Sequence, residues 1–210
     1  MKRVFLGNKE LTTIATVTNG GGGGCDDTQK WVDYFNGTLT EFTVPEGVTK
    51  IRNNAFLNCR NLTGVTIPSG VTSIGYGAFS NCSSLSSITI PYSVIEISNY
   101  AFDGCSSLTG ITIPNSLTSI GYGVFHSCTS LTSIAIPDSV KKIDMYAFVG
   151  CSGLTSVTIQ NSTSKLAYNT DAFKGISSSA KLYVPSNLLA DYQADSKWTD
   201  AFKGGIYAIQ

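Results

Sequence analysis

The sequence predicts a repeat solenoid: a right-handed coil with one short parallel β-strand per 23-residue turn, an irregular or 3-10 helical convex side and a small C-terminal capping helix. Three series of residues indicate this fold, because each steps by 23 positions without a slip. They are Pro45, Pro68, Pro91, Pro114 and Pro137; Cys59, Cys82, Cys105, Cys128 and Cys151; and Leu62, Leu85, Leu108, Leu131 and Leu154. Repeats of about 20 to 50 residues are typical of stacked architectures.

Each repeat unit, or rung, ends in a segment of the form L-x-x-I-x-I, as in LTGVTI at 62–67. Alternating β-branched residues suit a short strand with one buried face, and the following proline ends it because proline has no N–H to donate. The next segment turns the chain back, with Val71, Ile74 and Phe79 expected to point inward. One unit cannot bury these apolar residues alone, so the units must stack.

The array extends past the regular units at both ends. LTEFTV at 39–44 matches the strand pattern, and AKLYVP at 180–185 offers a later strand after a slightly longer unit. Residues 186–198 carry apolar residues at helical spacing with Ser186 as the expected N-cap, which predicts a short capping helix. GGIYAI at 204–209 is expected to add a final strand. The solenoid therefore spans 39–185, and 186–210 form the C-terminal cap.

Two further segments precede the solenoid. Residues 1–24 are interpreted as an N-terminal arm, with two short apolar pieces that form a hairpin or an extended arm, followed by a polyglycine linker at 20–24. Polyglycine would cradle a phosphate only with a Lys-Ser/Thr pair after it, and that pair is absent from the sequence. Residues 25–38 contain Trp31 and Phe35 and are expected to form an N-terminal cap over the open end of the core.

These units resemble the BspA-like leucine-rich repeats, whose form is LxxIxIPxxVxxIGxxAFxxC, over about residues 39–185. The segment LYVPSNLLADYQADSKW is also similar to the usual end of such proteins. The resemblance implies a leucine-rich-repeat coil and a surface or secreted protein that engages host or matrix proteins. The commonest leucine-rich repeats bury Asn or Cys where this chain has Gly70, Ser93, Ser116 and Ser139. Functional residues of other repeat subclasses are therefore not carried over.

Composition excludes several classes of function. Charged residues are 13% of the chain, and 14 Lys and Arg balance 14 Asp and Glu, so no basic surface for nucleic acid is expected. No apolar run approaches the ~20 residues of a membrane helix. The N-terminus starts basic, but Asn8, Lys9 and Glu10 interrupt its apolar stretch, so no signal peptide is recognised. A surface of hydroxyls and amides is common on extracellular proteins.

No catalytic, cofactor-binding or metal-ligating residue is predicted. A zinc site needs closely spaced ligand pairs, whereas these cysteines lie one per rung and point the same way. We expect them to be buried, unreactive thiols that act as small hydrophobic residues. Cys25 lies outside the series and is the thiol expected to be reachable. His126 replaces Leu57, Ser80, Asp103 and Val149 at one repeat position, which indicates a surface turn rather than a Ser-His-Asp site.

The outward face of the strands is the candidate binding surface. Its expected residues are Thr66, Ser87, Thr89, Thr112, Ser133, Ser156 and Thr158. Two interpretations stay open: a solvated face that resists aggregation, or a broad surface for a protein or glycan, as solenoids often provide. No aromatic or arginine hot spot is recognised among these positions. Tyr76, Tyr100, Tyr122 and Tyr146 form a second column, which is expected to pack.

The leading hypothesis is therefore a non-catalytic, adhesin-like binding scaffold, extracellular or at the cell surface, whose protein or glycan ligand the sequence does not specify. It is expected to be a monomer or a weak dimer, because exposed end rungs can pair edge to edge. The alternative is a structural component of a phage or prophage tail, with assembly in the cytoplasm. Met1, the glycine-rich arm and the unrecognised signal peptide motivate this alternative.

Overall fold

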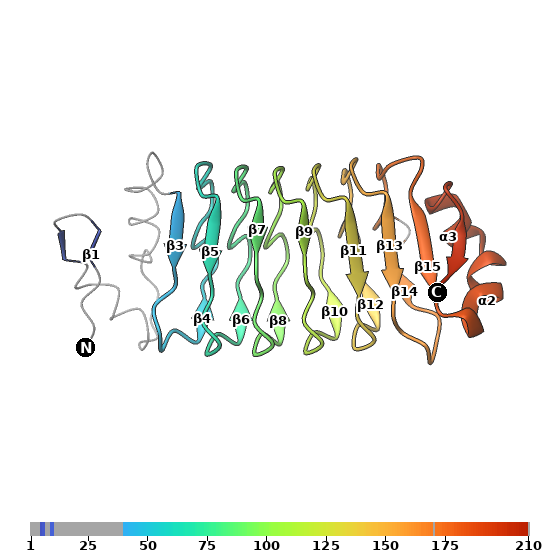
Figure 1. Cartoon of the computed structure of the whole chain (residues 1–210), viewed down its shortest axis with the longest axis horizontal. Helices are drawn as coiled ribbons and strands as arrows, with labels where there is room; N and C mark the ends of the chain where they lie inside the picture. The colour runs from blue at the N-terminus through green and yellow to red at the C-terminus, as the bar shows by residue number, and fades with distance from the viewer. Residues whose placement is uncertain (1–4, 7–8, 11–39, 170, 210) are drawn as a thin grey trace.

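The computed structural model describes residues 5–6, 9–10, 40–169 and 171–209. Figure 1 shows the rungs stacked side by side along the long axis, with the helices at the C-terminal end. Neighbouring rungs pair through parallel strands, as in the register Val65↔Ile88. The predicted coil, its parallel strands and its small C-terminal helical cap are confirmed.

The first strand of each rung forms one long face, which we call the first ladder. Its members are β3 (Glu41–Thr43), β5 (Gly64–Thr66), β7 (Ser87–Ile88), β9 (Gly110–Ile111), β11 (Ser133–Ile136), β13 (Ser156–Ile159), β15 (Lys181–Val184) and β16 (Ile206–Ala208). They pair in the orders β3-β5-β7-β9 and β11-β13-β15-β16. The strands predicted within 39–44, 180–185 and 204–209 are all present. The longer last unit is also present, since Val157 pairs with Leu182, 25 residues on.

A second ladder corrects the expectation of one strand per rung and an irregular convex side. Its two-residue strands are β4 (Lys50–Ile51), β6 (Ser73–Ile74), β8 (Glu96–Ile97), β10 (Ser119–Ile120), β12 (Lys142–Ile143) and β14 (Ala167–Tyr168), in the orders β4-β6-β8 and β10-β12-β14. Each rung repeats the backbone path of the one before, so any extended segment meets a partner carbonyl or N–H one rung away. Even the turns bond this way: Phe79 N donates to Ala101 O at 2.8 Å.

Columns of identical side chains fill the interior. Val71, Ile74 and Phe79 are fully buried, as predicted, and all five repeat leucines have no exposed surface. Six phenylalanine rings stack along the coil, with centroids 5.0–5.7 Å apart and interplanar angles of 18° or less between neighbours: Phe56, Phe79, Phe102, Phe125, Phe148 and Phe173. The core is therefore one continuous column that no rung could form alone.

The five repeat cysteines are free and buried, as expected, but they do more than fill space. Cys82 Sγ donates to Phe56 O at 3.0 Å, and Cys105 Sγ donates to Phe79 O at 3.2 Å. Cys128 and Cys151 repeat the contact with Phe102 O and Phe125 O. Burial raises the pKa of Cys151 to about 12 and also raises the pKa values of Cys105 and Cys128. The thiol protons therefore stay in place and join successive rungs.

Thiol reactivity tests this arrangement. In a Cys25→Ser variant, we expect no reaction with a thiol reagent in native buffer and five reactive thiols after unfolding in guanidinium, because the thiolate is the nucleophile and burial suppresses it. Absorbance with a chromogenic disulfide counts the thiols in both states. Rapid labelling of any of the five in the folded protein would contradict the assignment.

The C-terminal cap consists of a 3-10 helix, η2 (Ser186–Leu188), and two short α-helices, α2 (Leu189–Gln193) and α3 (Ser196–Ala201). The prediction that Ser186 is an N-cap is wrong: Ser186 lies inside η2, which has no side-chain cap. The side-chain cap belongs to Asp195, whose carboxylate accepts from Lys197 N at the start of α3. The helical spacing of apolar residues continues through this break, so the sequence predicts one helix where the structure has three short ones.

At the other end, β1 (Phe5–Leu6) and β2 (Lys9–Glu10) pair antiparallel. This hairpin lies within the predicted arm, although its second strand precedes the apolar piece LTTIATV. The predicted polyglycine linker and the predicted cap at 25–38, with Cys25, lie outside the described residues. The domain boundaries stay predictions.

Candidate functional site

The outward face of the first ladder carries the seven residues predicted from the sequence. Ser133 pairs with Ser156 across β11 and β13, and Thr66, Ser87, Thr89, Thr112 and Thr158 lie in or directly after their strands. Alternation explains the placement, because their strand neighbours Val65, Ile88 and Val157 are buried. Ser156 and Thr158 are half-buried, and the other five are exposed.

A neighbouring column of hydroxyls forms hydrogen bonds within the protein, whereas these seven do not. Thr63 Oγ1 donates to Thr40 O at 2.7 Å, and Thr109 Oγ1 donates to Ser86 O at 3.3 Å, so this column satisfies carbonyls of the preceding rung. Ser86, Thr132 and Thr155 continue it. Within the described part of the chain, the seven predicted hydroxyls have no protein partner. They are therefore free to bond a ligand or water.

A hollow of about 840 Å³ lies at the C-terminal end of this face. Ser156 and Thr158 on β13, Lys181 and Tyr183 on β15, and Tyr207, Ala208 and Ile209 at β16 line it. Tyr183 and Tyr207 are register partners, with ring centroids 5.9 Å apart and planes tilted by 32°. The face thus ends in an aromatic pair, which is the side-chain type most common at energetic hot spots of interfaces.

Ser156 and Thr158 were predicted to lie on this face, whereas Lys181, Tyr183 and Tyr207 were not. The signal was present, since Leu182 and Val184 are inward positions of the predicted strand AKLYVP and place Lys181 and Tyr183 outward. Tyr207 follows in the same way from the buried Ile206. Both strands lie outside the regular 23-residue units, which are the units that predict the outward positions.

A family model described as "BspA type Leucine rich repeat region" matches residues 33–151 and 95–193, in six copies. The chain belongs to this family. A leucine-rich repeat protein of T. pallidum is similar in structure, with 33% identity, a TM-score of 0.59, and 65% of this chain and 76% of that chain covered. A leucine-rich repeat protein from Eubacterium ventriosum is 27% identical, with a TM-score of 0.56 and 67% and 44% of the two chains covered.

The pneumococcal vaccine antigen PcpA shares the fold, at 20% identity and a TM-score of 0.69, with 81% of this chain and 42% of that chain covered. This chain therefore spans less than half of the Eubacterium ventriosum protein and of PcpA. A search of curated proteins found no match. The family assignment confirms the resemblance inferred from the 23-residue units.

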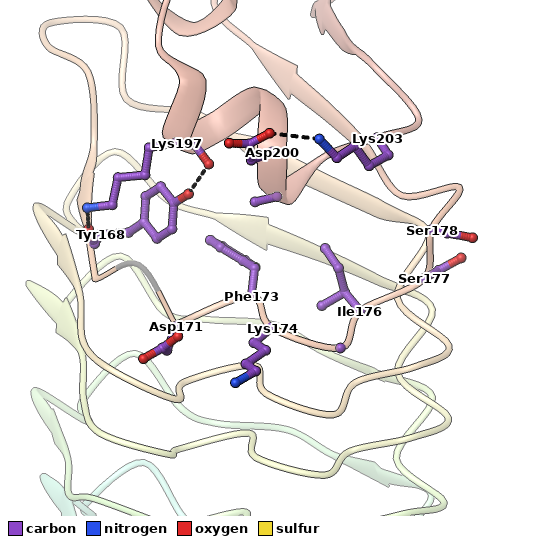
Figure 2. A pocket seen from close by; sticks show the side chains of 12 residues that line it. Tyr168, Asp171, Phe173, Lys174, Ile176, Ser177, Ser178, Lys197, Asp200 and Lys203 are labelled. Carbon is purple, nitrogen blue, oxygen red and sulfur yellow. Dashed lines mark hydrogen bonds and ion pairs between the residues drawn. The ribbon is translucent and has the colours of Figure 1, made fainter.

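A second hollow, of about 380 Å³, lies in this BspA-type protein between the last rung and α3. Figure 2 shows its contacts: the Tyr168 hydroxyl donates to Lys197 O, the Lys197 ammonium donates to Tyr168 O, and Lys203 pairs with Asp200 at 2.8 Å. Two of its three lysines are thus engaged within the protein. The two contacts between Tyr168 and Lys197 fasten the cap to the coil, and we assign this hollow a structural role.

His126 lies in a surface turn, as predicted, but its ring is engaged by neighbouring side chains. Its Nδ1 is 2.7 Å from Asp103 Oδ1, and both side chains are only partly exposed. Asp103 also accepts from Ser80 Oγ at 3.4 Å, while Ser127 Oγ lies 3.2 Å from the same His126 nitrogen. A catalytic triad places the carboxylate and the hydroxyl on opposite ring nitrogens. Here both meet Nδ1, so this BspA-type repeat uses the cluster to join rungs.

The tyrosine column packs partly on itself. Tyr76, Tyr100, Tyr122 and Tyr146 form edge-to-face contacts with neighbouring centroids 5.1–5.8 Å apart, and Tyr76 is 47% exposed. Edge-to-face pairs stabilise by about 0.5–1.5 kcal/mol beyond burial, which supports the predicted packing role.

Among the described residues of this BspA-type protein, no group of three or more His, Cys, Asp or Glu side chains is arranged to hold a metal ion. No helix in that part is long and apolar enough to span a membrane.

Proposed function

We propose that this protein is a surface-exposed or secreted binding scaffold that engages an extracellular protein or glycan through the outward face of the first ladder. The observation that carries the proposal is the row of exposed hydroxyls without protein partners that ends in the Tyr183–Tyr207 hollow. Membership of the BspA-type repeat family supports a binding role rather than catalysis. The placement outside the cell rests on the family and on the surface rich in hydroxyls and poor in charge.

The regular spacing of side chains on the first ladder favours binding of a ligand over a large area. Parallel pairing holds the outward side chains at fixed spacing, so they lose little conformational freedom on binding. Hydroxyls both donate and accept, which suits polar protein surfaces and glycans alike. The energetic centre is expected at the C-terminal end, because rigid aromatic side chains contribute more per residue than threonines do.

Charge insertion tests the proposal. Thr89→Glu and Thr112→Glu should each weaken binding to an extracellular-matrix protein by about tenfold or more, since burying an unpaired carboxylate against a ligand costs at least about 1.4 kcal/mol. Surface plasmon resonance against a panel of immobilised matrix proteins and glycans measures the loss. Binding has first to be detected with the unaltered protein.

Thr118→Glu is the matched control. Thr118 is the same residue type and is exposed, but it lies just before β10 in the second ladder. It should bind as the unaltered protein does. If Thr89→Glu and Thr112→Glu also bind normally, the first-ladder face is not the binding site.

A further inference from the structure

We infer that the hollow formed by β13, β15 and β16 binds an acidic sugar, with its ring on the tyrosine pair and its carboxylate at Lys181. The inference deepens the proposed function, on which it rests, by naming the ligand class that this end of the face takes. It depends on three features of the lining: one unopposed positive charge, a fixed aromatic surface and free hydroxyls.

Among the described residues that line the hollow, Lys181 is the only charged one. Its side chain is exposed, and its ammonium lies 5.7 Å from the centre of the Tyr207 ring. Within the described residues no carboxylate pairs with it, in contrast to Lys142, which is 2.6 Å from Asp144. A single cation without a counterion attracts an anion, and the described lining contains no acidic residue that would repel one.

The aromatic surface is held in place before any ligand arrives. The Tyr207 hydroxyl donates to Gly204 O at 3.1 Å. The ring lies against Gly205, where a Cβ would be 2.8 Å from the Tyr207 oxygen, and the φ of +104° at Gly205 also requires glycine. The ring is therefore fixed by its own turn while 45% of the residue stays exposed. A rigid, exposed ring is the partner that the C–H face of a sugar needs, because little freedom is lost on stacking.

The hydroxyls of Ser156 and Thr158 complete the site. They have no partner within the described chain and stand beside Lys181 and Tyr183 in register, through the pairs Ser156↔Lys181 and Thr158↔Tyr183. Sugar hydroxyls need such donors and acceptors. An apolar protein segment would need a larger apolar floor than Ala208 and Ile209 provide, which favours the sugar.

Saturation-transfer NMR and titration calorimetry with defined methyl glycosides test the inference. The acidic probes are those of glucuronic acid and galacturonic acid; the neutral counterparts are those of glucose and galactose. We expect at least one acidic probe to bind at least tenfold more tightly than its neutral counterpart. Lys181→Gln should abolish that difference, and Tyr207→Ala should reduce binding of the acidic probe at least tenfold. Circular dichroism checks that Tyr207→Ala folds.

Two control variants are matched to these. Lys142→Gln removes another exposed lysine, and Tyr76→Ala removes another exposed tyrosine, both outside the hollow; neither should change sugar binding. The inference is overturned if no acidic probe binds, or if Lys181→Gln binds the acidic probe as tightly as the unaltered protein. These results are independent of the Thr89→Glu and Thr112→Glu assay on matrix proteins, so failure of the sugar site and failure of the proposed function can be told apart.

Discussion

Replacing Phe102 with alanine is expected to lower the free energy of unfolding by about 3–5 kcal/mol. Phe102 is fully buried, and its ring stacks between Phe79 at 5.3 Å and Phe125 at 5.7 Å. The substitution removes the ring from both contacts and leaves a cavity in the middle of the column. Repeated backbone bonds hold both neighbours, Phe79 N to Ala101 O at 2.8 Å and Phe125 N to Ala147 O at 2.9 Å, so the cavity cannot close by collapse.

Urea titration followed by far-ultraviolet circular dichroism measures the effect. The midpoint should fall while the slope of the transition stays constant, because the surface exposed on unfolding is unchanged. Tyr92→Ala, in the same repeat, is the control: Tyr92 is 78% exposed, so its loss should leave the midpoint within error. A similar shift for both variants would mean that the phenylalanine column does not dominate stability.

Most of the fold could be predicted from the 23-residue repeat period. Inward positions followed from it directly, because a side chain that recurs every 23 residues must meet its own copy in the next rung. The period predicts that Leu62, Phe79 and Cys82 lie in the core, and all three are buried in the structure. It could not show the second ladder, since a two-residue strand such as β6 carries no alternation to detect.

Hydrogen bonds between rungs were harder to predict from the sequence, because they depend on which atoms face each other across rungs. The sequence marked the cysteines as small apolar residues, but only coordinates show Cys82 Sγ aimed at Phe56 O. The contact between His126 and Asp103 is of the same kind: the two residues share a repeat position in a surface turn, but the sequence does not show that the ring and the carboxylate meet. The strand-face hydroxyls were found, whereas Tyr183 and Tyr207 were missed because they lie in strands that depart from the 23-residue step.

Replacing Trp198 with alanine is expected to have an effect of similar size, about 3–5 kcal/mol, but confined to the C-terminal end. Trp198 is 1% exposed, and its ring contacts Tyr168 at 4.2 Å, Tyr192 at 5.0 Å and Phe202 at 5.9 Å between centroids. These residues come from the last rung, α2 and the end of α3. The indole is thus one of two cap rings that cover Phe173 at the open end of the phenylalanine column, with centroids 6.0 Å apart for Trp198 and 5.0 Å apart for Phe202.

The position of Trp198 determines which strands the loss of stability affects. A central rung packs against neighbours on both sides, so it does not unfold alone. An end rung has one neighbour and can unfold locally while the other rungs stay folded. Hydrogen exchange should therefore quicken in β15 and β16 of Trp198→Ala while β7 and β9 keep their protection. Ser196→Ala, an exposed change on the same helix, should leave all four strands protected. Because β16 is reached only after α3, opening the cap also removes Tyr207 from Tyr183, so acidic-sugar binding should be lost with it. Undiminished protection in β16 would show that the strand holds its place without the cap.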